Sequence, residues 1–142
     1  MLLDTNDSEP KSTIEVLQEV RSPSIPDDAH VMTVLVNHPP GAPGYPPHRL
    51  PGGPGFGYMI GGEMLFELEG EEPRVLCAGE AFWGPGGDVI HHQDANNRTD
   101  IPYRFVNTIL GVPGQPMREW VTEEELEARK GLRVNNCPPR AL

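Results

Sequence analysis

Proline and glycine recur at short intervals along this chain, and this spacing constrains the fold more than any other feature. The 142 residues include 17 prolines and 16 glycines. Both residue types destabilise a helix interior, proline because it lacks a backbone donor and glycine because it loses the most conformational entropy. The chain is long enough for one compact domain. We therefore expect an all-β domain of short strands joined by tight turns.

Apolar or alternating segments separated by turn residues follow one another along most of the chain. The segments that we expect to form strands are 14–20, 31–36, 56–60, 63–69, 74–77, 81–83, 89–93 and 103–110. A capping box that begins at Thr122 predicts a short helix, which Gly131 should end. Many short strands with one terminal helix fit a double-sheet jelly roll or a small barrel. We expect a disordered tail over 1–12, the barrel over 13–121, and the C-terminal helix and tail over 122–142.

The charge balance and the cysteine content narrow the choice of partner and compartment. The chain has 11 Lys and Arg against 21 Asp and Glu, a formal net charge of −10 at pH 7. Nucleic acid and anionic membrane surfaces are therefore not expected partners. No apolar run reaches the roughly 18 residues of a membrane span, and we see no signal peptide. Two cysteines, Cys77 in the expected core and Cys137, form no disulfide framework, so we expect a cytoplasmic protein.

A pattern of turn residues and histidines in the second half of the chain is the most specific signal. It reads Gly79-x5-Pro85-x-Gly87, followed by His91-His92 and then Asn96. This pattern resembles the second conserved motif of the cupin superfamily, and 56–63 is similar to the strand that ends the first cupin motif. The resemblance covers about residues 31–112. It implies a double-stranded β-helix, that is, a jelly-roll barrel with its site inside.

The metal-binding pattern that the resemblance implies is incomplete in this chain. The usual first motif, His-x-His and then Glu, reads here as His48-Arg49-Leu50 with no Glu in the loop that follows. We expect His91 rather than His92 to face inward, and alternation along an extended strand would place Gln93 on the same face as His91. A divalent metal, if one is bound, would then be held by His48, His91 and Gln93.

The candidate site residues follow from the same segments. His48 and His91 would act as acid and base or jointly polarise a substrate oxygen. Arg49 or Arg104 would offset the charge of a substrate carboxylate or enolate. The residues expected to contact the substrate are Tyr58, Phe66, Trp83, Gln93 and Phe105.

The missing metal ligands favour a non-oxidative cupin enzyme. We expect proton-transfer chemistry of the isomerase, cyclase or dehydratase and lyase type, on an apolar or carbonyl-bearing small molecule inside the barrel. One alternative is a metal-dependent dioxygenase with a degenerate ligand set, and another is a non-catalytic cupin that binds a small molecule. The resemblance also implies a homodimer, in which the segment 14–20 would add a strand to the partner.

Overall fold

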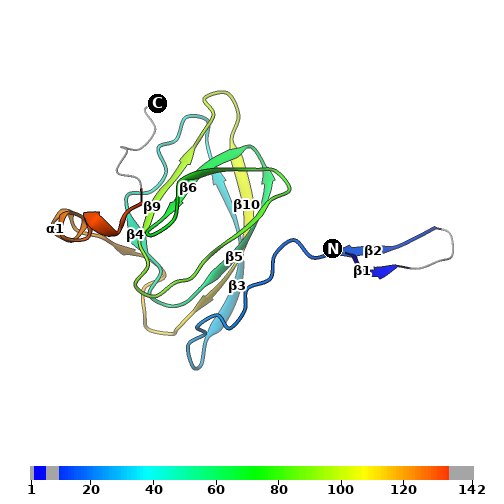
Figure 1. Ribbon diagram of the computed structural model, residues 1–142, viewed down its shortest axis with the longest axis horizontal. Helices are drawn as coiled ribbons and strands as arrows, with labels where there is room; N and C mark the ends of the chain where they lie inside the picture. Colours follow the sequence, from blue (N-terminus) through cyan, green and yellow to red (C-terminus); the bar gives the residue numbers. More distant parts are fainter. Residues whose placement is uncertain (1, 6–9, 135–142) are drawn as a thin grey trace.

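The computed structural model describes residues 2–5 and 10–134, which form two facing antiparallel sheets and a few peripheral elements (Figure 1). The first sheet contains, in spatial order, β3 (His30–His38), β10 (Tyr103–Gly111), β5 (Gly55–Gly61) and β8 (Ala81–Gly84). The second contains β11 (Glu119–Trp120), β4 (His48–Arg49), β9 (His91–Asn96), β6 (Glu63–Leu68) and β7 (Arg74–Cys77). From β3 to β11 the chain alternates between the sheets, except at the β6–β7 hairpin. The all-β, double-sheet prediction is confirmed.

The core lies between the sheets and consists of side chains that alternate inward along each strand. Its buried members are Met59, Met64, Phe66, Leu68, Leu76, Phe82 and Tyr103. Phe82 links the two sheets, because its ring lies 5.3 Å from the ring of Phe66 and 5.1 Å from the ring of Phe105, measured between centroids. These three aromatic side chains also line the cavity described below.

A β-bulge in β9 decides which of its side chains face inward. The pairing of β6 with β9 shifts by one residue beside His92. As a result, His91 and Asp94 line the interior although they are three residues apart. His92 and Gln93 face the other side of the sheet, where Gln93 donates a hydrogen bond to Glu67. His91 faces inward as expected, but strict alternation was the wrong guide to Gln93 and Asp94.

The C-terminal elements cover the outer face of the second sheet. These are α1 (Glu123–Ala128) and the 3-10 turn η1 (Lys130–Leu132), which lie beside β4 and β9 (Figure 1). The hydroxyl of Thr122 accepts a hydrogen bond from the backbone N–H of Glu125 at 3.1 Å, which confirms the predicted cap. Arg129, just after the helix, donates to the carboxylate of Glu69 in the turn that follows β6. Ion pairs therefore attach these elements to the sheet.

The N-terminal region differs from the expected strand. The strand β2 (Thr13–Glu15) is shorter than the expected segment 14–20 and pairs with β1 (Leu2–Thr5), part of the expected tail. This hairpin stands apart from the two sheets in Figure 1. The chain then crosses the first sheet, where the side-chain amide of Gln18 donates to the carbonyl of Phe82 at 3.0 Å. The homodimer through this segment stays a prediction.

Two further expectations concern the cysteines and the compartment. Cys77 is exposed at the end of β7, an edge strand, and not in the core. Cys137 and the expected C-terminal tail from residue 135 onward lie outside the described residues. Within the described ranges, no helix has the length and apolar character needed to cross a membrane. The cytoplasmic location stays a prediction.

Candidate functional site

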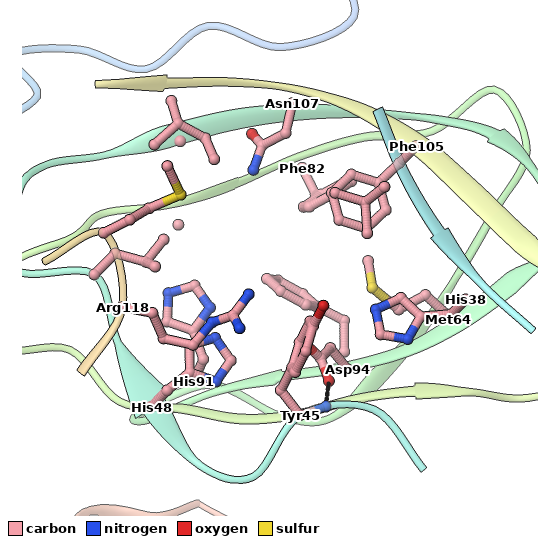
Figure 2. Close-up of a pocket in the computed structure, with 17 residues that line it drawn as sticks. His38, Tyr45, His48, Met64, Phe82, His91, Asp94, Phe105, Asn107 and Arg118 are labelled. Atoms are coloured by element: carbon pink, nitrogen blue, oxygen red, sulfur yellow. Dashed lines mark hydrogen bonds between the residues drawn. The ribbon is translucent and has the colours of Figure 1, made fainter. Parts of the chain in front are cut away.

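A cavity of about 110 Å³ that opens to solvent lies between the two sheets (Figure 2). Its polar lining consists of His38, Tyr45, His48, His91, Asp94, Asn107 and Arg118. Apolar side chains of both sheets form the remaining wall, among them Val36, Phe66, Phe82 and Phe105. A concave, mainly apolar chamber with a few converging polar groups is typical of a small-molecule site.

The polar side chains are arranged around Tyr45. His48, His91 and Arg118 lie together at one end of the cavity in Figure 2, and His38 lies at the other end. The Tyr45 ring is 6.2 Å from the His48 ring and 5.1 Å from the His38 ring. The rings of His48 and His91 stack at 5.1 Å. A ligand in the cavity would therefore meet two imidazoles and a guanidinium at one end.

The loop before β4 sets the tautomer of His48. Its Nδ1 lies 2.8 Å from the carbonyl oxygen of Pro46, two residues earlier. A carbonyl only accepts, so Nδ1 carries the proton and Nε2 of the neutral ring carries the lone pair. Burial lowers the pKa of His48, and the positive charge of Arg118 lowers it further against the opposing hydrogen bond to Pro46. His48 is therefore a neutral imidazole with a free acceptor.

His91 is the most strongly perturbed histidine of the cavity. It is 8% exposed, and its Nε2 has no hydrogen-bond partner in the described part of the chain. Burial, and then the positive charge of neighbouring groups, lowers its pKa to about 3. Gly84 on the facing sheet makes room for the ring, since a Cβ there would lie 2.7 Å from Cε1 of His91. A neutral imidazole with a free nitrogen remains available to a ligand at neutral pH.

Asp94 is the carboxyl group of the cavity. Its Oδ1 accepts a hydrogen bond from the backbone N–H of Tyr45 at 2.7 Å. Gly44 adopts a positive φ of 79° and has no Cβ, so the loop can approach Asp94 this closely. Burial raises the pKa of Asp94 to about 6, although the Tyr45 N–H and Arg118 act in the opposite direction. This carboxyl therefore changes its protonation state close to neutral pH.

Arg118 brings a permanent positive charge to the same space. Its guanidinium carbon lies 3.7 Å from the centre of the Tyr45 ring and 5.3 Å from that of Trp120. Its Nε is buried and has no hydrogen-bond partner among the described residues. These contacts hold the guanidinium by cation–π attraction and leave its donors available.

Four of the residues predicted from the sequence line the cavity, namely His48, His91, Phe66 and Phe105. Neither predicted arginine lines it. Arg49 follows His48 on a strand and so points to the other face, where Glu119 and Glu125 accept its hydrogen bonds. Arg104 precedes Phe105 on β10 and is exposed on the outer face of the first sheet. The structure therefore corrects the placement of both arginines.

The remaining predicted contact residues also lie elsewhere. Tyr58 is 42% exposed on the outer face of the first sheet. Trp83 lies on the same face, where its ring stacks on that of Phe56 at 6.2 Å. Gln93 donates to the buried carboxylate of Glu67 at 2.6 Å, behind the second sheet. Strand alternation explains the first two positions, and the bulge in β9 explains the third.

Several cavity residues were missed by the sequence analysis. These are His38, Tyr45, Asp94, Asn107 and Arg118. Tyr45 lies in the same proline-rich loop as His48, which was an available signal. Arg118 belongs to a Gly- and Pro-rich segment without a motif, so no local signal marked it.

The donor atoms present do not fit the divalent metal that the cupin resemblance implies. Gln93, the third expected ligand, is bonded to Glu67, and the cavity has Leu50 where the second histidine of the first motif would stand. In the described ranges, no group of three or more His, Cys, Asp or Glu side chains is arranged to hold a metal. Catalytic zinc sites use three protein ligands. We therefore derive no step through a metal.

Comparison with known proteins supports the fold. No protein-family model matches the chain, and no curated protein sequence does. The structure is similar to the DMSP lyase DddQ from Ruegeria pomeroyi DSS-3, with 24% identity over 64% of this chain and a TM-score of 0.52. The match covers 43% of the lyase, so this chain spans less than half of its length.

For two other similar structures, the match to this chain covers most of their length. KdgF from Halomonas sp. is 28% identical over 74% of this chain and 85% of its own, with a TM-score of 0.45. A cupin protein from Bacteroides fragilis, BF4112, is 18% identical over 77% and 93%, with a TM-score of 0.46. The alternating double-sheet topology and the likeness to the lyase structure define a cupin-type double-stranded β-helix. The fold that the glycine and histidine motif predicted is confirmed.

Proposed function

We propose that the protein is a small-molecule enzyme of the cupin type that transfers a proton on a carbonyl-bearing substrate inside this cavity. One observation carries the proposal: Asp94, whose pKa is raised to about 6, shares the cavity with two unprotonated histidines. Acid–base catalysis is most effective when the pKa of the group lies near the working pH. The reaction class is an isomerisation, cyclisation or dehydration.

The proposed roles follow from the protonation states. Asp94 removes a proton from carbon or returns one, while the Tyr45 N–H holds its Oδ1 in place. His91 stays neutral and hydrogen-bonds the substrate carbonyl through its free Nε2, which stabilises negative charge that develops on the oxygen. His48 accepts a proton at Nε2 or relays one. The aromatic wall around Phe82 and Phe105 keeps water away from these groups.

Proton exchange in heavy water tests the proposal. A panel of small ketones, oxo acids and unsaturated acids is incubated with the protein and a chelator, and loss of C–H signals is followed by NMR. Wild type should accelerate exchange for at least one compound. Asp94→Asn and His91→Asn should slow it by about 10²- to 10⁴-fold. The chelator separates this activity from the metal-dependent alternative.

His92→Asn is the matched control, because His92 is the next residue on β9 and faces the opposite side of the sheet. It should keep exchange within about threefold of wild type, the size of a change that touches no reacting group. Exchange at the buffer rate for the whole panel, or an Asp94→Asn variant as fast as wild type, would contradict the proposal. Saturable binding without exchange would indicate the non-catalytic alternative.

A further inference from the structure

The cavity contains one permanent charge, and its sign is positive. Of the described residues that line it, Arg118 is the one arginine or lysine. Burial keeps His38, His48 and His91 unprotonated at neutral pH, because it lowers the pKa of each. Any ligand that enters therefore meets a guanidinium in a partly desolvated space, where electrostatic attraction is stronger than in water.

Arg118 differs from the other arginines near the second sheet in its partners. Arg49, Arg129 and Arg133 each donate hydrogen bonds to carboxylates of the protein. For Arg118, the described part of the chain provides ring contacts, and no carboxylate lies within ion-pair distance. Its buried Nε is also unpaired there. A guanidinium has five N–H donors arranged to bind a carboxylate through two of them.

Neither of the nearest acidic side chains, Asp94 and Glu119, pairs with the guanidinium of Arg118. Asp94 already uses Oδ1 to accept the Tyr45 N–H, and no hydrogen bond joins it to Arg118. Glu119 follows Arg118 in the chain, but it faces the outer side of the sheet and accepts from Arg49 at 3.1 Å. Asp94 and Arg118 attract each other only at longer range, and the N–H donors of the guanidinium are left for a ligand.

We propose that Arg118 selects a carboxylate, so that the cavity takes a small organic acid. The carboxylate pairs with the guanidinium, held between Tyr45 and Trp120, and the carbon chain lies along the wall formed by Phe82 and Phe105. Asn107, on the facing sheet, has a buried Oδ1 without a partner in the described ranges, which can accept a hydrogen bond from a hydroxyl or other donor on the carbon chain of the acid. This inference rests on the proposed function, since it names the substrate class of the same site.

Matched acids and amides test this inference. Crotonate, butyrate and 2-hydroxybutyrate are compared with their neutral amides at constant ionic strength. Binding is followed by the fluorescence of Trp120 in a Trp83→Phe background, because these are the two tryptophans of the chain. Each acid that binds should bind about 10- to 100-fold more tightly than its amide, the range expected for a charge-assisted hydrogen bond.

Variants assign the preference to Arg118. Arg118→Gln should reduce the acid-to-amide ratio to about one, and Arg118→Lys should restore part of it. Arg21→Gln is the matched control, because it removes the same charge from an exposed segment and should leave the ratio unchanged. Circular dichroism of each variant verifies folding.

Three results would overturn the inference: equal affinities for acid and amide, an unchanged ratio in Arg118→Gln, or no binding of any acid. The outcome is separable from that of the proposed function. Deuterium exchange on neutral ketones, together with equal affinities for acids and amides, would leave proton transfer standing and the acid selectivity refuted. Selective acid binding without exchange in any compound would leave the acid selectivity standing and refute proton transfer.

Discussion

The two faces of the second sheet both carry buried ionisable groups, but they differ in how these groups are partnered. On the outer face, Glu67 is fully buried and accepts hydrogen bonds from Arg133 and Gln93. On the cavity face, Asp94 accepts one hydrogen bond, from the Tyr45 backbone. Burial alone would raise the pKa of both carboxyls. The partners of Glu67 nevertheless keep its pKa below the usual value, whereas the pKa of Asp94 rises to about 6.

This contrast shows that hydrogen-bond partners, and not burial, separate the lowered pKa of Glu67 from the raised pKa of Asp94. The paired side chains of the outer face attach the C-terminal elements to the sheet. The less satisfied side chains of the cavity retain binding capacity for a ligand, which is typical of functional sites. His92 is an exception on the outer face, because neither of its ring nitrogens has a partner in the described residues.

We expect the largest effect from a substitution that removes the paired carboxylate on the outer face of the second sheet. Glu67→Ala removes a fully buried carboxylate from its hydrogen bonds with Arg133 and Gln93. We expect the free energy of unfolding to fall by about 3–5 kcal/mol, as for removal of one partner of a buried ion pair. Urea denaturation measures this change, with Glu72→Ala in an exposed turn as the control. A loss below about 1 kcal/mol would mean that the pairing does not stabilise the fold.

The second effect is a pH-dependent change in stability caused by Asp94, on the cavity face of the sheet. Folding raises the pKa of Asp94 from 3.8 to about 6, so the folded state holds this proton more tightly than the unfolded state does. Stability from this group is therefore present at low pH and is lost as the pH rises through this window. Asp94→Asn removes the charge and keeps an oxygen for the Tyr45 N–H.

We expect Asp94→Asn to be more stable than wild type by up to about 3 kcal/mol at pH 8, since one pKa unit corresponds to about 1.4 kcal/mol. The difference should disappear near pH 4, where the carboxyl is protonated in the folded protein. Thermal and urea unfolding at the two pH values provide the measurement. A difference that does not vary with pH would show that Asp94 is not a strained carboxylate.

The smallest expected effect tests whether the ring of His91, on the cavity face, is held in a fixed position. In Gly84→Ala the new methyl group would lie 2.7 Å from Cε1 of His91, so the ring must move. We expect this overpacking to lower the free energy of unfolding by about 1–2 kcal/mol. We also expect slower C–H exchange of the test compounds in heavy water. Gly61→Ala is the control, because a Cβ there meets no atom within 4 Å. Equal behaviour of the two variants would argue against a fixed His91.

The fold was predictable because its signals are local. Turn residues at short spacing, alternating strands and the Gly79-x5-Pro85-x-Gly87 motif are all readable without knowledge of distant contacts. The same motif correctly placed His91 in the interior. The position of Gln93 was not predictable in this way, because the bulge in β9 forms only where this strand pairs with β6.

The arginines illustrate a second limit. The sequence predicts a positive charge in the site but points to Arg49 and Arg104 for it. Alternation already argued against both, since each is adjacent to a residue expected in the site, His48 and Phe105. Arg118 reaches the cavity through the pairing of β11 with β4, a contact between segments about 70 residues apart. No local pattern indicates such a contact.

Strand β11 joins the sheet through two residue pairs, Glu119 with Arg49 and Trp120 with His48. Such a short ladder is a weak attachment, and Arg118 immediately precedes it. The ion pair between Arg49 and Glu119, on the opposite side of the sheet from the cavity, adds to this attachment. A charge on the outer face of the sheet, at Glu119, therefore helps to hold the segment from which Arg118 enters the cavity.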